Sequence, residues 1–308
     1  MIYTVTLNPS LDYLVRTDAL RPGALCRTRE ERLYPGGKGV NVSLVCAALG
    51  LPTRALGFIA GRTGAMFASL LADTGVEYDF CRLERGMTRI NVKISAHEQT
   101  GLNGAGPAIP ADALERLADT LDTLGGDDWL VLSGSVPADV PADIYARLLG
   151  RVRGRGVRTL VDAAGDALKN ALPCAPDLVK LGLNELDALV GGAPRTPAGL
   201  AACARELQAA GARSVLIALD GAGAVFVPAS GSALYLTPAA AEDAAQPVGA
   251  GSAMSAGWIY ARTYGFSVPE TVRFAAAAAG AAAQTDWLPG RAAIEAAFRR
   301  IGQPEEIE

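Results

Sequence analysis

Short runs of β-branched and apolar residues alternate with longer segments of helical periodicity along most of this 308-residue chain. Such alternation is typical of βαβ units and of a mainly parallel sheet. We therefore expect an α/β fold for residues 1–308, as one domain with a parallel central sheet flanked by helices. The expected strands are Ile2–Leu7, Arg54–Ile59, Trp129–Leu132, Arg158–Asp162, Asp177–Leu181 and Ser214–Leu219. The expected helices include Val40–Leu49, Ala65–Thr74, Pro110–Leu124, Pro141–Val152, Thr196–Ala210 and Ser252–Tyr264.

One strand departs from this alternation. In Thr88–Ser95 every second residue is apolar and the residues between are polar, so that Arg89, Asn91 and Lys93 share one face. A period of two predicts a half-exposed strand. Together with the irregular segment Leu11–Leu33, it predicts a small antiparallel sheet outside the main one. This β-lid is formed by about residues 11–34 and 88–106, and its polar face could meet a ligand.

Charge and composition exclude several functions. The chain has 28 Lys and Arg against 32 Asp and Glu, a net charge of −4, with no basic stripe. Nucleic acid is therefore not expected as a partner. The five cysteines are far apart and there is a single histidine, His97, so neither a disulfide framework nor a zinc site is expected. His97 lies near the expected tip of the lid, as a solvated loop residue.

The chain also lacks the patterns of export and of membrane insertion. Met1–Leu7 starts a strand without a basic or long apolar leader, which favours a cytoplasmic location. Ala275–Ala283 is strongly apolar but falls well short of the ~20 residues that span a bilayer. It is expected to be a closely packed core helix, and no membrane is expected as a partner.

A glycine-rich stretch, Pro247–Gly257, leads directly into an apolar helical segment. Glycines allow a tight turn close to a ligand, and the free N–H groups at the start of a helix bind anions such as phosphate. An ordinary glycine-bearing loop before a buried helix explains this stretch equally well. Gly249–Met254 lacks the third glycine of G-x-G-x-x-G, and the chain has no P-loop motif, so a dinucleotide or P-loop fold is disfavoured.

A second glycine-rich stretch, Tyr34–Asn41, also opens a helix and contains Lys38. A cation at a helix N-terminus opposes the helix dipole unless an anion is shared with the backbone N–H groups. Lys38 therefore favours a bound anion. The alternative is a solvated lysine in a flexible turn.

Taken in order, several motifs resemble those of the ribokinase-like sugar kinases, in the branch of 1-phosphofructokinase and tagatose-6-phosphate kinase. They are T-L-N-P-S-L-D at Thr6–Asp12, G-G-K-G-V-N at Gly36–Asn41, T-R-I-N-V-K at Thr88–Lys93, L-S-G-S-V-P at Leu132–Pro137 and V-G-A-G at Val248–Gly251. The resemblance covers essentially the whole chain. It implies a cleft at the edge of the sheet, under a β-lid, in which a substrate hydroxyl attacks the γ-phosphoryl group of ATP.

The resemblance also implies roles for individual residues. On the substrate side, Asp12 and Asn41 would hold sugar hydroxyls, Gly37 would lie against the sugar, and the phosphate already on the substrate would bind to Lys38, Arg89 and Lys93. Asn103 and Ser135 complete the implied substrate site. The implied nucleotide site comprises Lys180, Glu185, Asp220, Gly221 and Gly223, with Glu185 acting on Mg²⁺ through water. The N–H groups of Gly249, Ala250 and Gly251 would stabilise the transferring phosphoryl group.

The sequence departs from the family pattern on the nucleotide side. The family's G-A-G-D ends in the aspartate that accepts the proton of the attacking hydroxyl, and here that position is Ser252. The family's K-P-N-x-x-E becomes Lys180–Glu185 with Gly182 at the asparagine position, and Asp220 replaces a glycine. The acidic residue of T-E-I-N is Gly101. Loss of a general base typically costs 10²–10⁴-fold in rate, although phosphoryl transfer depends mostly on positioning and electrostatics.

These observations predict a kinase that uses ATP and Mg²⁺ to phosphorylate a hexose phosphate, and fructose 1-phosphate is the first candidate substrate. Its activity is expected to be weakened because Ser252 stands at the position of the catalytic aspartate. The alternatives are an inactive sugar-phosphate-binding homologue, acting as a sensor or partner subunit, and a tagatose-6-phosphate kinase. Asp220, Glu242 or Asp243 could serve as the base in place of Ser252. A homodimer formed through the lid is also possible. Asp162 is expected either to line the cleft or to cap the next helix. Trp258 and Trp287 are expected in the core.

Overall fold

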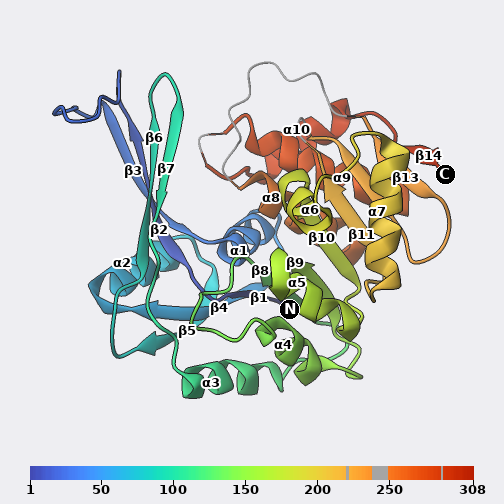
Figure 1. Cartoon of the computed structure of the whole chain (residues 1–308), viewed down its shortest axis with the longest axis horizontal. Coiled ribbons are helices and arrows are strands. Elements are labelled where there is room, and N and C mark those ends of the chain that lie inside the picture. Colours follow the sequence, from blue (N-terminus) through green and yellow to red (C-terminus); the bar gives the residue numbers. More distant parts are fainter. Residues whose placement is uncertain (220–221, 238–248, 286) are drawn as a thin grey trace.

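The computed structural model describes residues 1–219, 222–237, 249–285 and 287–308. A large sheet of ten strands has helices on both faces, and a smaller four-stranded sheet projects from one end of it (Figure 1). The large sheet has the order β14-β13-β12-β11-β10-β9-β8-β1-β4-β5. Its strands are β1 (Ile2–Thr6), β4 (Thr53–Ala60), β5 (Glu77–Leu83), β8 (Trp129–Ser133), β9 (Arg158–Asp162), β10 (Leu178–Gly182), β11 (Val215–Ala218), β12 (Ala224–Val227), β13 (Ala233–Leu236) and β14 (Glu305–Ile307).

The expected parallel sheet is confirmed. All pairs from β5 to β11 are parallel, whereas β12, β13 and β14 extend the sheet by antiparallel pairing. The six expected strands correspond to β1, β4, β8, β9, β10 and β11. The strands β5, β12, β13 and β14 were not expected from the sequence. Three of these are hairpin or edge strands of three or four residues, too short to show a periodic pattern.

Two large hydrophobic cores cover the two faces of the large sheet, and a third, smaller one packs Phe67 and Leu71 against Ile59 of β4. Along β8, Leu130 and Leu132 contact one core and Trp129 and Val131 the other, as expected for alternating side chains. The helices are α1 (Lys38–Ala48), α2 (Gly61–Ala72), α3 (Ala111–Leu121), α4 (Ile144–Val152), α5 (Gly165–Ala171), α6 (Leu183–Val190), α7 (Pro197–Ala209), α8 (Ala250–Thr263), α9 (Val268–Ala282) and α10 (Arg291–Arg300), with a short 3₁₀ helix at Leu172–Cys174. The first core includes residues of α3, α4, α5 and α7, and the second residues of α1, α8, α9 and α10.

The tight packing of α8 against α9 depends on small residues. A methyl group added at Gly257 of α8 would lie 2.9 Å from the Cβ of Ala278 and 3.0 Å from the carbonyl oxygen of Phe274. Most of the alanines of α9 are fully buried, as predicted for this apolar segment. Within the described ranges, no helix combines the length and the hydropathy needed to cross a bilayer.

The smaller sheet is the predicted lid, with the order β3-β2-β6-β7. Its strands are β2 (Ser10–Arg16), β3 (Glu30–Gly36), β6 (Arg89–Ser95) and β7 (Gln99–Asn103). Residues 11–34 are therefore less irregular than expected, since only residues 17–29 between β2 and β3 lack regular structure. The two outer pairs, β2–β3 and β6–β7, are antiparallel, and the central pair β2–β6 is parallel.

The lid is buried around Asp12 and Asn91 on its polar face, and around Leu11 and Val15 on its other face. Asp12 and Asn91, paired across β2 and β6, are 3% and 7% exposed. On the opposite face Ile90 and Leu102 are 37% and 60% exposed. The lid thus directs its polar residues toward the carboxyl edge of the large sheet, where β1, β8, β9 and β10 end. In sheets of this kind the carboxyl ends of the strands form the ligand-binding edge.

Candidate active site

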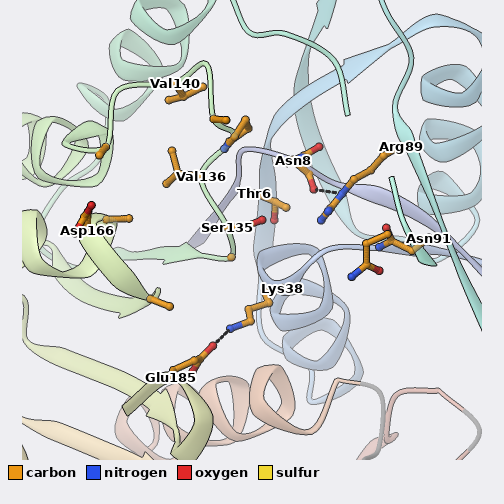
Figure 2. A pocket seen from close by; sticks show the side chains of 17 residues that line it. Thr6, Asn8, Lys38, Arg89, Asn91, Ser135, Val136, Val140, Asp166 and Glu185 are labelled. Atoms are coloured by element: carbon orange, nitrogen blue, oxygen red, sulfur yellow. Dashed lines mark hydrogen bonds and ion pairs between the residues drawn. The ribbon is translucent and has the colours of Figure 1, made fainter. Parts of the chain in front are cut away.

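A cavity of about 620 Å³ lies between the lid and the carboxyl ends of the large sheet. Figure 2 shows Asn8, Arg89 and Asn91 along one side, Val136, Val140 and Asp166 along the other, and Lys38 and Glu185 joined at the base. Asn103 and Ser135 also line it. Lys38, Arg89, Asn103, Ser135 and Glu185, predicted from scattered motifs, therefore share one cavity.

On the lid side, Asp12 is held by three donors. Its Oδ1 atom accepts hydrogen bonds from Ser10 Oγ at 2.7 Å and from Asn91 Nδ2 at 3.0 Å, and its Oδ2 atom pairs with Lys93 Nζ at 3.0 Å. The adjacent backbone of Gly36 is so close that an added methyl group would lie 2.6 Å from this carboxylate. Asp12 is therefore fixed in position, and Lys93 already has a carboxylate partner.

Arg89 differs from the other predicted phosphate-binding cations. Its Nε atom donates to the carbonyl oxygen of Asn8 at 3.1 Å, and its Nη1 atom lies 3.5 Å from the carbonyl oxygen of Gly104. In the parts of the chain that the structure describes, it forms no ion pair. Burial lowers the pKa of Arg89, and the Asp12 carboxylate opposes this change. Because arginine stays protonated in proteins, a cation that contacts no carboxylate of the described residues faces the cavity.

Lys38 and Lys180 belong to one charge network. Asp162, fully buried at the end of β9, accepts from Lys38 Nζ at 3.0 Å through Oδ1 and from Lys180 Nζ at 3.1 Å through Oδ2. Glu185 accepts from Lys38 Nζ at 2.5 Å and from the backbone N–H of Gly182 at 2.7 Å. Two carboxylates of this chain thus supply negative charge at Lys38, where the sequence pattern favoured a bound anion.

The charges of this network shift the pKa values of Asp162 and Lys38. Burial alone would raise the pKa of Asp162, but Lys180 and Lys38 outweigh burial and the pKa is lowered. Burial alone would lower the pKa of Lys38, but Asp162 and Glu185 raise it. Both groups are therefore charged at neutral pH. Asp162 does not cap the next helix, whose N-cap is Ala164, and it is fully buried and is not among the residues that line the cavity, so neither expectation for Asp162 is met.

The first turn of α8 lies directly beside this network. Its N-cap, Gly249, has a left-handed backbone (φ 81°), and an added methyl group there would lie 2.4 Å from Leu288. A methyl group at Gly251 would lie 2.6 Å from Lys180 Nζ. The absence of a side chain at Gly251 thus allows the Lys180 ammonium group to approach the start of α8. A cation alone is disfavoured there, because the N-terminal end of the helix dipole is positive. Asp162 offsets that charge, and an anion here would meet both Lys180 and the N–H groups of Ala250 and Gly251.

Three other predicted site residues, Gly37, Asn41 and Ser252, lie at or near the starts of α1 and α8. Gly37, the N-cap of α1, has φ 121°, and an added methyl group would lie 2.7 Å from Thr6 Cγ2. Asn41 is buried near Gly249, and its Oδ1 atom has no hydrogen-bond partner among the described residues. Ser252 is almost completely buried in the first turn of α8. Asn41, predicted to bind the sugar, therefore lies beside Gly249, predicted to bind the transferring phosphoryl group.

Comparison with known proteins agrees with this geometry. The pattern of the pfkB family carbohydrate kinases matches residues 6–286. The 1-phosphofructokinase of Rhodobacter capsulatus is 40% identical over 90% of this chain and 88% of its own. That of Bacillus subtilis is 32% identical over 94% of both chains. Phosphofructokinase-2 from Escherichia coli, solved with substrates and products, superposes with a TM-score of 0.90 at 29% identity, over 97% of this chain and 99% of that chain.

The chain belongs to the pfkB family of carbohydrate kinases. A pfkB kinase brings a sugar and a nucleotide together, and here the two predicted halves of the site join where Lys38 contacts Glu185. Gly223 lies just before β12, where its carbonyl oxygen accepts from the N–H of Leu219. Asp220 and Gly221, predicted on the nucleotide side, and the possible bases Glu242 and Asp243 lie outside the described residues.

Some residues of this pfkB site were not assigned from the sequence. Asn8, Asn91 and Tyr145 carry no individual signal, although the first two lie inside the quoted motifs. Tyr145 is fully buried, and its hydroxyl donates to the carbonyl oxygen of Gly134 at 3.1 Å, which fixes the loop that presents Ser135. Only the contacts made by the folded chain reveal these roles.

The expectations for Trp258, His97 and Trp287 have different outcomes. Trp258 is buried in the core and His97 is exposed in the turn between β6 and β7, as expected. Trp287 is only partly buried, and its ring stacks on Tyr34 of β3 with centroids 4.2 Å apart. The core expectation for Trp287 is therefore wrong, because this ring joins the lid to the segment that follows α9.

Proposed function

We propose that this pfkB kinase transfers the γ-phosphoryl group of ATP to a hexose phosphate, with fructose 1-phosphate as the first candidate. The hydroxyl at C6 of the sugar forms a bond to the γ-phosphorus, the bond from that phosphorus to the oxygen bridging to the β-phosphate breaks, and the hydroxyl proton is released. The products are fructose 1,6-bisphosphate and ADP.

The observation that carries this proposal is Arg89. Lys38 and Lys93 contact carboxylates of the chain, whereas Arg89 lines the cavity with no carboxylate partner among the described residues. Guanidinium groups bind phosphate through paired hydrogen bonds. A phosphorylated sugar therefore fits this cavity better than a neutral one. Asn103 and Ser135 line the same cavity, and Asp12 is hydrogen-bonded to Asn91, which also lines it. These residues and Asn41, which lies beside Gly249, would bind the sugar hydroxyls.

The residues on the nucleotide side fit ATP with Mg²⁺. Mg²⁺ keeps several waters and is usually held by one or two carboxylates together with substrate phosphates. Both oxygens of Glu185 already accept hydrogen bonds, one from Lys38 and one from Gly182 N–H, which suits a contact through water. When bound, the metal would neutralise phosphate charge. Lys180, Gly249, Ala250 and Gly251 would hold the transferring group at the start of α8.

We further propose that turnover is weak because Ser252 occupies the position of the general base. A serine hydroxyl does not accept a proton efficiently near neutral pH. The nearby described carboxylates, Asp162 and Glu185, are each bound to a lysine, so neither offers a free base. This arrangement favours a second candidate, a sugar-phosphate-binding homologue without useful turnover. Tagatose 6-phosphate is the alternative substrate.

The exposed face of the lid supports a homodimer. Ile90 and Leu102 lie on the face turned away from the cavity, and both are exposed. Burial of such residues against a second lid would remove apolar surface from water. We propose pairing through this face, and Leu102→Lys should shift the protein to a smaller species in sedimentation.

The experiment that tests the function is a coupled assay of ADP release with Mg-ATP, together with calorimetric titration. Fructose 1-phosphate, tagatose 6-phosphate and free fructose are compared in the unmodified protein, in Arg89→Ala and in the control Arg205→Ala, an exposed residue of α7. Loss of a charge-assisted partner should weaken fructose 1-phosphate binding roughly 10- to 150-fold in Arg89→Ala only. Equal affinity of the unmodified protein for fructose and fructose 1-phosphate would refute the proposal.

A further inference from the structure

We propose that Asn91 reads one hydroxyl of the substrate next to the hydroxyl held by Asp12, so that the two side chains together select a vicinal diol. This inference rests on the proposed function and specifies the sugar that the site accepts. It makes Asn91, at the centre of the polar face of β6, a residue that determines specificity.

The side chain of Asn91 uses only half of its hydrogen-bonding capacity within the chain. It is 7% exposed and lines the cavity. Its Nδ2 atom donates to Asp12 Oδ1 at 3.0 Å, whereas its Oδ1 atom is buried and has no partner among the described residues. A buried carbonyl oxygen without a donor is costly, and such groups normally have a partner in the functional state.

The orientation of the amide group follows from its neighbour. The Asp12 carboxylate pairs with Lys93 Nζ at 3.0 Å, and a carboxylate only accepts hydrogen bonds. A rotation of the Asn91 amide by 180° would place its oxygen against the Asp12 carboxylate, where two acceptors would repel. The NH₂ group must therefore face Asp12, and the unpaired oxygen must be an acceptor. A ligand group that satisfies it must be a donor, such as a hydroxyl.

Asp12 has a matching capacity for one more donor. Its Oδ1 atom already accepts from Ser10 and Asn91, but its Oδ2 atom accepts only from Lys93 among the described residues. Each carboxylate oxygen accepts about two hydrogen bonds. The free acceptors of Asp12 and Asn91 thus belong to two groups joined by one 3.0 Å hydrogen bond. Adjacent hydroxyls on a sugar chain supply two donors at neighbouring positions.

The charged neighbours on β6 favour this role for Asn91. Arg89 and Lys93 flank it on the same face, and neither can accept a hydrogen bond from a hydroxyl. An aspartate at position 91 would place a second carboxylate against Asp12, which like-charge repulsion disfavours. An asparagine provides the acceptor without the charge.

The test compares fructose 1-phosphate with its 3-deoxy and 4-deoxy derivatives by Kd and kcat/KM. The unmodified protein should bind each deoxy sugar roughly 5- to 150-fold more weakly, because each leaves one buried acceptor unpaired. In Asn91→Leu, one of the two deoxy sugars should bind about as tightly as fructose 1-phosphate itself, whereas the other should still bind more weakly than fructose 1-phosphate. Gln99→Leu on β7, exposed and outside the cavity, should still bind both deoxy sugars more weakly than fructose 1-phosphate.

A merely structural role for Asn91 predicts something different. If Asn91→Leu only removes the hydrogen bond to Asp12, it should weaken binding of all three sugars by the same factor. The affinity ratios between fructose 1-phosphate and each deoxy sugar would then be unchanged, and this result would overturn the proposal. If Asn91→Leu does not fold, the unmodified protein still provides a test. A deoxy sugar, at either position, that binds to it as tightly as fructose 1-phosphate excludes a diol site. If no hexose phosphate binds or reacts at all, the proposed function itself fails.

Discussion

The carboxylate of Asp162 binds the ammonium group of Lys180, with 3.1 Å between Oδ2 and Nζ, where neither side chain is appreciably exposed to solvent. The same carboxylate binds Lys38 through its other oxygen. It therefore links the residue that opens α1 to the residue beside the start of α8. A buried ion pair of this kind is costly to break, because the remaining charge keeps its desolvation penalty without its partner.

Asp162→Asn should lower the free energy of unfolding by about 3–5 kcal/mol, because Lys180 would be left buried without a carboxylate. Urea unfolding followed by circular dichroism measures this change. Asp166→Asn is the matched control, since that side chain is 78% exposed and lies close in sequence. It should have little effect. Adding Lys180→Met to Asp162→Asn should recover much of the loss, and a further loss in the double variant would contradict this explanation.

The network also predicts how stability depends on pH. The pKa of Asp162 is lowered, so its contribution is present above its ordinary value of about 3.9 and is lost as the pH falls through the lower pKa of the folded state. The pKa of Lys38 is raised, so its contribution is present below about 10.4 and is lost only as the pH rises through its folded value. The stability difference between the unmodified protein and Asp162→Asn should therefore be nearly constant from about pH 5 to pH 9. A large change within that range would show that another group dominates.

Trp287 should report movement of the lid. Trp129 and Trp258 are buried, whereas Trp287 is partly exposed and stacks on Tyr34 of the lid strand β3. Binding of a sugar phosphate under the lid should change the tryptophan fluorescence, and Trp287→Phe should remove most of that change. Trp258→Phe is the control and should retain it. A signal that survives Trp287→Phe would place the change elsewhere in the protein.

Much of the fold could be predicted because its signals are local. The alternation of β-branched and helical segments identified the strands that became β1, β4, β8, β9, β10 and β11. The period of two in Arg89–Ser95 identified the lid strand β6 and its polar face. The parallel pairing of β2 with β6 could not be predicted, because it joins residues about 80 positions apart and has no local signature.

The site was predicted less completely for a physical reason. Family motifs brought attention to Lys38 and Lys180, but a motif does not show which groups neutralise a charge. Asp162 was left open, because the two lysines that bind it lie 124 and 18 residues away along the chain. Likewise, Arg89 differs from Lys38 and Lys93 only in the absence of a carboxylate partner within the described residues, which the folded structure alone reveals.

We propose that a kinase site is retained around a substituted base position. Ser252→Asp should therefore raise kcat with fructose 1-phosphate and Mg-ATP, by somewhere in the 10²–10⁴-fold range that a general base supplies. The helix N-terminus, near Lys180, should keep the new carboxylate ionised. Gly182→Asn should add to the effect only when the aspartate is present, since residues that act as one unit are not additive.

The most direct measurement is kcat of the unmodified protein, Ser252→Asp, Gly182→Asn and the double variant in one coupled assay. We expect slow turnover in the unmodified protein, a large gain in Ser252→Asp, no gain in Gly182→Asn, and a further gain when Gly182→Asn is added to Ser252→Asp. Turnover of the unmodified protein at the 1–100 s⁻¹ typical of kinases, unchanged by Ser252→Asp, would contradict this expectation and would mean that another group accepts the proton.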